Sequence, residues 1–371
     1  MLVGVPREIK VQEYRVGLVP ANVRELTERG HRVVVESGAG SDIGMTDARY
    51  EAAGAKIVGT AAEIFSNADL IVKVKEPQAS ERRRLKPGQI LFTYLHLAAD
   101  RDQTRELVES GSTCVAYETV TSDAGGLPLL APMSEVAGRM SIQAGAHFLE
   151  KAHGGLGVLL GGVPGVAPAR VVILGGGVVG RHAAAMASGL GAEVVVLDRN
   201  IEVLRSIWRQ FGSAVHTLFS SRDAIEEHCI AADLVIGGVL VPGASAPKLV
   251  RAELLKRMKP GSVLVDVAID QGGCFETSRA TTHDDPTYVI DKVIHYCVAN
   301  MPGAVPRTST IALNNATLPF VLALADKGIE ALRDDKHLLN GLNVHRGKIT
   351  CQGVAESLGY AYVEPRAALG L

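Results

Sequence analysis

The chain has 371 residues, enough for two domains of ordinary size, and its 47% hydrophobic and 21% charged residues describe a soluble globular protein. A formal net charge of -2 shows no basic excess, which argues against nucleic acid or an anionic membrane surface as a partner. Forty glycines with only 4% aromatic residues favour many tight turns, as in α/β enzymes.

Cysteine usage and apolar patterning bear on the compartment. The five cysteines lie far apart and form no CxxC pair, so we expect reduced thiols, no metal site and a reducing compartment. The N-terminal MLVGVPREIK lacks the layout of a signal peptide. The most apolar region, Gly157–Gly180, is interrupted by Pro164, Pro168 and Arg170, which argues against a membrane span. We therefore expect a cytoplasmic protein with no membrane partner.

Short apolar runs alternate with helical patterns along the first third, as is typical of parallel α/β architecture. Strands are predicted at Leu2–Val5, Arg32–Glu36, Leu70–Val74, Ile90–Leu95 and Thr113–Tyr117. Helices are predicted at Ala21–Arg29, Asp47–Ala53 and Arg101–Glu109. The charged run Glu81–Lys86 is interpreted as a solvated helical face, and Lys73 as an edge-strand lysine that reaches solvent.

A long connecting helix is predicted at Met133–Ala152, capped by Ser134 and with Glu135 in its first turn. A second series of elements follows it from Ala169, and the tail after Pro306 is expected to return to the first domain. In the second series, strands are predicted at Arg170–Leu174, Glu193–Leu197, Ala214–Leu218, Leu234–Gly237 and Ser262–Val267, and helices at Val179–Leu190 and Ile201–Phe211.

The two series echo each other. ADLIVKVKEP (Ala68–Pro77) is similar to ADLVIGGVLVP (Ala232–Pro242), and each is followed by a helical stretch and then by LKPGQILFTYLHL or MKPGSVLVDVAID. This similarity predicts two domains with one winding, in which His96 and Asp270 lie near the carboxyl ends of corresponding strands, where open α/β sheets bind ligands. A chance similarity between two amphipathic βα units is the alternative.

A dinucleotide site is predicted at VVILGGGVVG, in which Gly175, Gly177 and Gly180 form G-x-G-x-x-G between an apolar strand and a helix. These glycines permit a tight turn, close approach of a pyrophosphate and close helix packing, and the helix N-terminus offers N–H groups to the phosphates. Asp198, which ends EVVVLD about 20 residues further on, favours NAD over NADP. The alternative is a glycine-rich turn without a ligand.

Three side chains of the first domain suit a small 2-oxo or 2-amino acid. Arg15 could clamp a carboxylate, Lys75 could polarise a carbonyl, and His96 could move protons near neutral pH. Each has a structural alternative: a loop arginine paired with Glu13 or Glu8, a lysine that snorkels to solvent, and a satisfied core histidine. All three are expected where strands end, and this convergence favours the functional interpretation.

The segments REIKVQEYRVGLVP, VKVKEP, LFTYLHLA, APMSEVAGRM, GGVPGV, GGGVVG, DVAIDQGG and YCVANMPGAVPRTST together resemble the bacterial alanine dehydrogenase family, in the family's order and over nearly the whole chain. That family is related to the NAD-binding component of transhydrogenase. The resemblance implies NAD-dependent, reversible conversion of L-alanine to pyruvate and ammonium, and a homohexamer. Two alternative functions are a soluble transhydrogenase component and a non-catalytic NAD-binding module.

Site residues carry over from the resemblance position by position. It implies that Arg15 and Lys75 bind the substrate and that His96 and Asp270 serve proton transfer. Val203 departs from the family, which commonly has a basic residue at this position near the adenosine end of the cofactor. Beyond the three glycines, the implied cofactor contacts are Ser134, Val178, Val179, Asp198, Ser220, Val239, Leu240, Val267, Ala268, Ile269, Asp270, Arg279, Val298, Ala299, Asn300 and Met301.

The expected fold is therefore α/β, with two doubly wound, Rossmann-like domains and an active-site cleft between them. Residues 1–128 and 307–371 are expected to form the substrate domain, and residues 129–306 the NAD-binding domain. The expected partners are small molecules (L-alanine, pyruvate and ammonium), with no nucleic acid and no metal.

Overall fold

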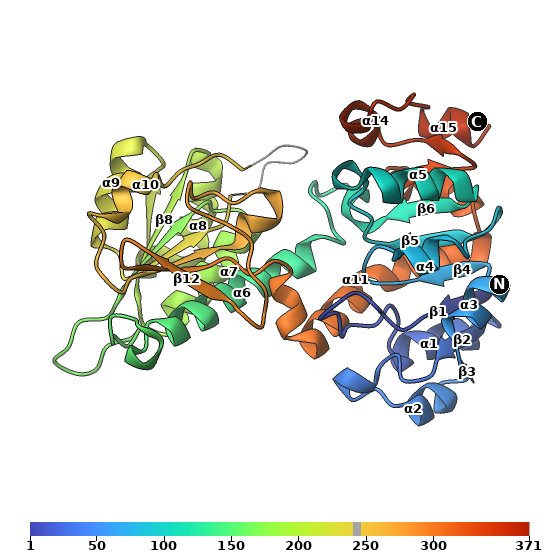
Figure 1. Ribbon diagram of the computed structural model, residues 1–371, viewed down its shortest axis with the longest axis horizontal. Coiled ribbons are helices and arrows are strands. Elements are labelled where there is room, and N and C mark those ends of the chain that lie inside the picture. Colours follow the sequence, from blue (N-terminus) through green and yellow to red (C-terminus); the bar gives the residue numbers. More distant parts are fainter. Residues whose placement is uncertain (240–245, 371) are drawn as a thin grey trace. The chain divides into compact units, whose positions relative to one another are not determined.

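The structure is a computed structural model, which describes residues 1–239 and 246–370. The chain forms two compact units, one of Met1–Met133 with Val305–Leu371 and one of Ser134–Ala304. The sequence-based division lies after residues 128 and 306. In Figure 1 each unit is a sheet with helices on both of its faces.

The first unit contains an eight-stranded sheet in the order β15-β14-β6-β5-β4-β1-β2-β3. Strands β1 to β6 are parallel, while β14 and β15 are antiparallel to their neighbours. The strands are β1 (Leu2–Val5), β2 (Arg32–Glu36), β3 (Lys56–Val58), β4 (Leu70–Val72), β5 (Ile90–Thr93), β6 (Thr113–Ala116), β14 (Leu342–His345) and β15 (Lys348–Ile349).

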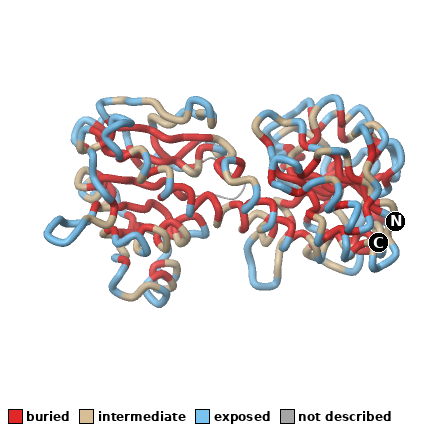
Figure 2. Tube along the Cα trace, turned by 90° about the horizontal axis from the view of Figure 1, so that it is seen from below, coloured by how far each residue is buried: buried red, intermediate tan, exposed pale blue. Residues whose placement is uncertain are grey.

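Alternating side chains along these strands build two cores, because successive residues of a strand point to opposite faces. Leu70, Val72 and Phe92 face one core, while Ile71 and Leu91 face the other. Both faces are apolar because helices cover both. Strands β4, β5 and β6 are buried along their whole length, and Figure 2 shows buried segments running through the interior of each unit.

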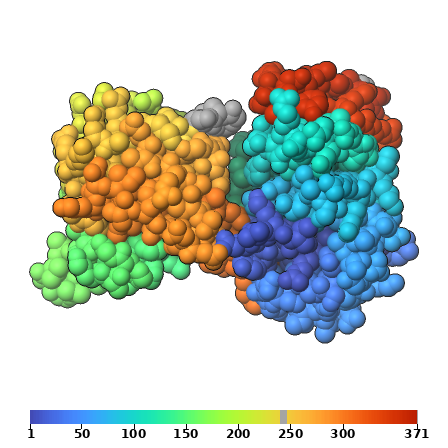
Figure 3. Space-filling view, viewed as in Figure 1, coloured from blue at the N-terminus to red at the C-terminus, as the bar shows by residue number. Residues whose placement is uncertain are grey.

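Ten helices of the described chain belong to the first unit, and the C-terminal ones confirm that the tail returns to it. Figure 3 shows the C-terminal segment, in red, against the teal residues of the same unit. The helices are α1 (Pro20–Glu28), α2 (Asp47–Ala52), α3 (Ala61–Asn67), α4 (Ala79–Arg82), α5 (Arg101–Ser110), α11 (Pro306–Lys327), α12 (Glu330–Asp334), α13 (Lys336–Leu339), α14 (Gln352–Leu358) and α15 (Pro365–Ala368).

The second unit contains a seven-stranded sheet in the order β12-β13-β11-β10-β7-β8-β9, of which only β12 is antiparallel. Its strands are β7 (Arg170–Leu174), β8 (Glu193–Asp198), β9 (Val215–Phe219), β10 (Leu234–Gly237), β11 (Val263–Asp266), β12 (Thr287–Ile290) and β13 (Val293–Tyr296). Its helices are α7 (Val178–Gly189), α8 (Ile201–Phe211), α9 (Arg222–Ala231), α10 (Ala252–Leu255) and most of α6 (Ala131–Phe148).

The predicted common winding is confirmed. From one edge, β3-β2-β1-β4-β5-β6 matches β9-β8-β7-β10-β11-β13, and an antiparallel strand, β14 or β12, follows in each sheet. His96 and Asp270 accordingly follow the equivalent strands β5 and β11. The strand order reverses beside β1 and β7, which is where doubly wound sheets bind ligands.

Several predicted ends of strands and helices were wrong. Strands β4, β5 and β6 end one to two residues early because the chain turns at the edge of the sheet, so His96 lies in a turn beyond β5. The connecting helix α6 begins at Ala131, whose N–H donates to the carbonyl of Leu127. Ser134 therefore lies within the helix and does not cap it.

The assignments of Lys73 and Glu81 to solvent were also wrong. Strand β4 lies in the middle of its sheet, and the Lys73 ammonium is fully buried between the carboxylates of Glu8 (3.0 Å) and Glu81 (2.8 Å). Helix α4 covers only the start of the charged run, and it turns Glu81 inward. A fully buried lysine directly after a central strand needs such partners, because an unpaired buried charge is very costly.

Helix α11 is, among the described residues, the one helix long and apolar enough to cross a membrane by length and composition. Half of its apolar window is buried inside the structure. Leu313, Val321 and Leu324 pack into the core of the first unit. This packing describes a core helix.

Candidate active site

The carboxyl edge of the first sheet gathers the three predicted substrate residues. Arg15 lies in the loop after β1, Lys75 follows β4, and His96 follows β5. These three strands are neighbours, in the order β5-β4-β1. The side chains thus follow strand ends, as expected, and the structure shows that these strands adjoin.

The side chain of Arg15 is buried, and its guanidinium is held by neighbouring residues. Its Nε and Nη2 atoms donate to the two carboxylate oxygens of Glu13 at 2.6 and 2.5 Å, and its Nη1 contacts the Sδ atom of Met133 at 3.0 Å. Burial alone would raise the pKa of Glu13, but the hydrogen bonds and charge of Arg15 lower it. The pairing of Arg15 with Glu13, considered as an alternative in the sequence, is thus present.

Lys75 is half-buried and stands in a negative environment. The carboxylate of Glu8 accepts the N–H of Val74 at 2.6 Å and that of Lys75 at 3.3 Å, while it also binds the Lys73 ammonium. The charge of Lys75 helps to lower the pKa of Glu13. The buried Glu8 therefore fixes the backbone that presents Lys75 at the sheet edge.

His96 is exposed, so the satisfied core histidine considered in the sequence is ruled out. Its φ of 50° is left-handed, which is uncommon for a residue other than glycine. Glu118, which follows β6, accepts the N–H of His96 at 2.6 Å and that of Leu95 at 3.2 Å. The same carboxylate lies 3.9 Å from Nδ1 of His96, and the imidazole stacks on Tyr94.

In the second unit, the turn between β7 and α7 fits a dinucleotide. Gly175 has a φ of 97°, and a Cβ atom on Gly180 would overlap the carbonyl oxygen of Gly175. Nothing lies within 4 Å of the position that a Cβ atom on Gly177 would take, so the backbone is open to a pyrophosphate there. The three glycines thus serve the turn, the helix packing and the open approach that were predicted for them.

Asp198 ends β8 and is tied to the same turn. Its Oδ2 accepts the N–H of Gly176 at 2.7 Å, and its Oδ1 accepts the N–H of Asn200 at 2.8 Å. Val203 packs beside Gly176, because a Cβ atom there would meet its Cγ1 at 2.7 Å. The carboxylate is therefore fixed beside the glycine turn, as a residue that binds the adenosine ribose must be.

The other cofactor contacts implied by the resemblance lie mainly beyond the carboxyl ends of the second sheet. Two depart from this pattern: Ser134 lies in α6, and Arg279 lies over the ring of Tyr288 at 4.1 Å. Leu240 lies outside the described residues. The rest are Val178 and Val179 after β7, Ser220 after β9, Val239 after β10, Val267, Ala268, Ile269 and Asp270 after β11, and Val298, Ala299, Asn300 and Met301 after β13.

Asp270 is exposed on a 3-10 turn, η6 (Val267–Gln271), directly after β11. Asp266, fully buried at the end of β11, holds this region by accepting the N–H groups of Ala268 at 3.1 Å and Cys274 at 2.9 Å and the hydroxyl of Ser278 at 2.5 Å. Burial raises the pKa of Asp266 despite these hydrogen bonds.

Most of the carboxylates that hold the predicted residues in place were not recognised from the sequence. The pairing of Glu13 with Arg15 was considered there, but not that Glu8 holds Lys75, that Glu118 holds His96, or that Asp266 holds the turn with Asp270. Glu118 and Asp266 come at or just after strand ends, so the rule that located His96 could have drawn attention to both. Glu8 and Glu13 lie in a loop whose course the sequence does not determine.

These features define a doubly wound protein of the dinucleotide-binding class. Residues 4–137 match the family model described as alanine dehydrogenase/PNT, N-terminal domain, and residues 141–352 match the corresponding C-terminal domain. The chain therefore belongs to the alanine dehydrogenase/PNT family, as the resemblance had indicated.

Relatives and solved structures agree with this assignment. The chain is 62% identical over 371 residues to an alanine dehydrogenase of Halomonas elongata, and 55% identical over 370 residues to one of Mycobacterium tuberculosis, each match covering 100% of both chains. A solved L-alanine dehydrogenase is similar with a TM-score of 0.94 and 53% identity, covering 97% of this chain and 99% of that one. A transhydrogenase from Sinorhizobium meliloti gives a TM-score of 0.81 and 27% identity over 95% of this chain and 99% of its own.

Proposed function

We propose that the protein is an NAD-dependent amino-acid dehydrogenase that converts L-alanine and water reversibly into pyruvate and ammonium. The observation that supports this most strongly is the placement of Arg15, Lys75 and His96 after three adjoining strands, in a chain similar over its full length to alanine dehydrogenases. The glycine turn with Asp198 suits NAD and disfavours a 2′-phosphate.

Arg15 and Lys75 bind and orient the substrate. Glu13 occupies the Nε and Nη2 edge of the guanidinium, so the substrate carboxylate is held from the side of Nη1, which contacts Met133. The Lys75 ammonium stabilises the negative charge that develops on the C2 oxygen. Together they fix which face of C2 is presented for reaction.

His96 and Asp270 carry the proton chemistry. A bound dinucleotide would supply the acceptor for the hydride that leaves C2 of the amino acid. His96 takes the proton of the water that adds to the resulting imine, and it returns a proton to the nitrogen as ammonia leaves. Asp270 directs the water or ammonia at C2.

The second candidate, a soluble transhydrogenase component, is supported by the likeness to the S. meliloti transhydrogenase. That likeness is at 27% identity, against 53% for the solved L-alanine dehydrogenase. A protein that passes hydride between two nucleotides has no need of a carboxylate clamp and an acid–base histidine. Alanine dehydrogenase activity is therefore the better proposal.

Assembly and location are part of the proposal. The family resemblance supports a homohexamer, which light scattering coupled to size exclusion would test. Four of the five cysteines are buried and all are free, which suits a reducing, cytoplasmic compartment.

The direct test follows NADH oxidation at 340 nm with pyruvate, with and without ammonium. We expect oxidation that depends on both. His96→Ala and Asp270→Ala should lose kcat by about 10²–10⁴-fold, because each removes a proton-transfer group, while NADH binding persists. Arg15→Ala and Lys75→Ala should impair pyruvate use more than NADH binding. Turnover without ammonium, or near-normal turnover of folded His96→Ala, would contradict the proposal.

A further inference from the structure

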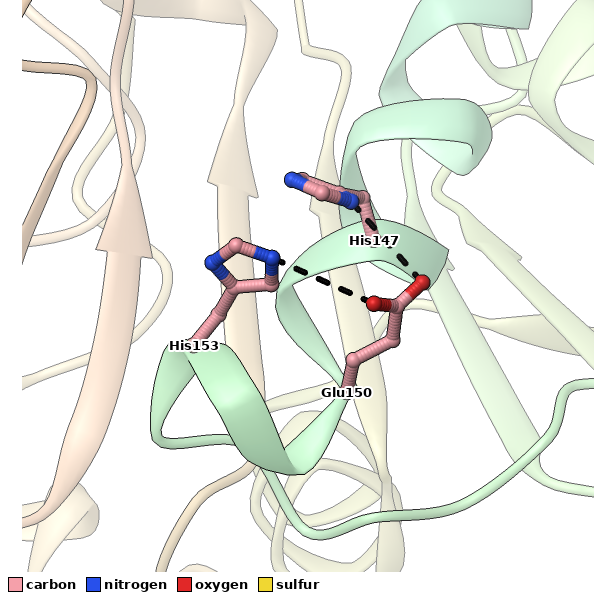
Figure 4. Close-up of side chains that lie close together, drawn as sticks. All are labelled: His147, Glu150 and His153. Carbon is pink, nitrogen blue, oxygen red and sulfur yellow. Dashed lines mark ion pairs between the residues drawn. The ribbon is translucent and has the colours of Figure 1, made fainter.

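Two histidines and a glutamate lie together on the surface of the second unit, away from the residues discussed so far. His147 lies in the last turn of α6, Glu150 follows the helix, and His153 ends the 3-10 turn η4 (Lys151–His153). Figure 4 shows both imidazoles close to the carboxylate and on the same side of it. His147 Nδ1 is 3.8 Å from Oε1 of Glu150, and His153 Nε2 is 3.9 Å from Oε2.

The spacing of these atoms suits a small divalent ion. One ligand atom from each residue lies within 4.8 Å of the other two. Zn²⁺ binds imidazole nitrogen and carboxylate oxygen at about 2.0–2.2 Å, so tetrahedral ligand atoms are roughly 3.3–3.6 Å apart. The three atoms can thus lie up to roughly 1.2–1.5 Å further apart than in an occupied tetrahedral site, a difference that exposed side chains can close by rotating about their side-chain torsions.

The backbone of this segment is already ordered, which lowers the entropic cost of binding. The carbonyl of Glu150 accepts the N–H groups of His153 and Gly155, both at 3.1 Å. The ring of Phe148 packs against both imidazoles, with centroids 5.1 and 5.5 Å away, and against Tyr296 of β13 at 5.5 Å. The three side chains thus project from a fixed turn on an aromatic support.

The mutual ion pairs do not account for this arrangement. Exposed pairs between imidazole and carboxylate contribute little to stability, and those at 3.8 and 3.9 Å are long. The two imidazoles also lie with their centroids only 4.0 Å apart. Two imidazole nitrogens and a carboxylate oxygen within 4.8 Å of one another are, in contrast, the donor set of three-ligand zinc sites.

We propose that His147, Glu150 and His153 form a binding site for a divalent transition-metal ion such as Zn²⁺, with water completing the coordination. The bound ion ties the end of α6 to the turn that follows it, and so stabilises the second unit without taking part in the reaction. The expectation of no metal rested on cysteine spacing, which carries no information about a site of histidine and glutamate. The pattern that indicates such a site is the regular spacing H-x2-E-x2-H from 147 to 153.

The test uses the full-length chain, free of any affinity tag and stripped with a chelator. Zn²⁺ titration by calorimetry should give one saturable site per chain, and Co²⁺ should give visible d–d absorption bands at the same stoichiometry. The melting temperature should rise on adding Zn²⁺, since a ligand that binds only the folded state stabilises it. None of these readouts depends on catalytic activity.

His147→Ala, His153→Ala and Glu150→Gln should each weaken Zn²⁺ binding by roughly tenfold or more and reduce the shift in melting temperature. His216→Ala, an exposed histidine of β9, is the matched control and should bind like the unaltered chain. Unchanged affinity in the three variants, or no saturable binding to the unaltered chain, would overturn the proposal.

Discussion

His96 occupies a backbone conformation that its own side chain does not favour. A left-handed residue other than glycine costs about 1–2 kcal/mol, so something must hold it. Glu118 supplies that restraint, because its one carboxylate accepts the N–H groups of Leu95 and His96. The imidazole is thereby directed away from the core, and it is exposed beyond the end of β5.

We predict that Glu118→Ala reduces kcat by about 10–100-fold, because the turn that presents His96 is released. The dissociation constant of NADH should change little, since the glycine turn and Asp198 belong to the other unit. Glu118→Gln is the matched variant: its amide oxygen still accepts an N–H, so it should retain more activity than alanine. Steady-state kinetics and NADH fluorescence titration measure both, and an unaltered kcat in Glu118→Ala would mean that His96 does not need this restraint.

At the scale of single residues, the sequence predicted which side chains gather and suggested Glu13 as a partner of Arg15, but not the carboxylate that holds His96. Arg15, Lys75 and His96 could be located because each follows an apolar run, and parallel strands end at one edge. The burial of Arg15 against Glu13, and the turn of the chain at His96, depend on loop paths and on a carboxylate from a different strand. Local patterns carry no information about such partners.

At the scale of elements, the buried charge cluster of Lys73, Glu8 and Glu81 lies directly after strand β4, in the middle of the first sheet. Burial alone would lower the pKa of Lys73, but the carboxylates of Glu8 and Glu81 raise it, so the ammonium stays charged. The pKa of Glu8 is raised, chiefly by burial and in part by Glu81. Two carboxylates thus depend on one ammonium.

We predict that Lys73→Met lowers the free energy of unfolding by about 3–5 kcal/mol, because it leaves two buried carboxylates without their cation. The change should be measured by urea unfolding, with Lys56→Met, an exposed lysine of β3, as the control. Adding Glu81→Gln to Lys73→Met should restore part of the loss. If Lys73→Met is no less stable than the control, the cluster is not needed for stability.

Most elements could be located from the sequence because the apolar runs are bounded by glycine, proline and charged residues. The ends of short elements were harder to predict. Strand β4 has three residues and α4 has four, and contacts with neighbouring elements determine where they end. The predicted start of α6 was wrong. Serine is a good N-cap by residue type, which favoured Ser134, but the chain is already helical at Ala131. Tertiary contacts outweigh capping preference there.

At the scale of the whole molecule, buried groups that ionise in alkali make stability depend on pH. Burial raises the pKa of the thiols of Cys114 and Cys229, and of the hydroxyl of Tyr296, to about 12. In the unfolded chain, thiols ionise near pH 8.5 and tyrosine near pH 10. Above those values the unfolded state loses protons that the folded state retains, so the free energy of unfolding falls until about pH 12.

We therefore predict that stability decreases steadily as the pH rises above about 9, by up to about 1.4 kcal/mol per pH unit for each such group. Cys229→Ala should flatten this dependence by one group's contribution. Ile225→Val in the same helix, α9, should lower stability without changing the slope. Urea unfolding at several pH values under reducing conditions measures both, and equal slopes in Cys229→Ala and the unaltered chain would contradict the prediction.

The common winding of the two units was accessible from the sequence because ADLIVKVKEP and ADLVIGGVLVP occupy equivalent strands. The antiparallel strands β14 and β12 were not predicted, since the tail and the segment after Asp270 carry weaker periodicity. The glycine-rich composition that favoured an α/β fold acts at this scale as well.

The insertion of the second unit within the first sets an order for synthesis on the ribosome. Residues 134–304 have all emerged before any of α11, β14 or β15 exists. Until then the side of β6 that later pairs with β14 is an open sheet edge, which invites pairing with other nascent chains. The unit whose synthesis begins first is therefore completed last. Its unpaired edge at β6 is the surface that most needs protection by a chaperone.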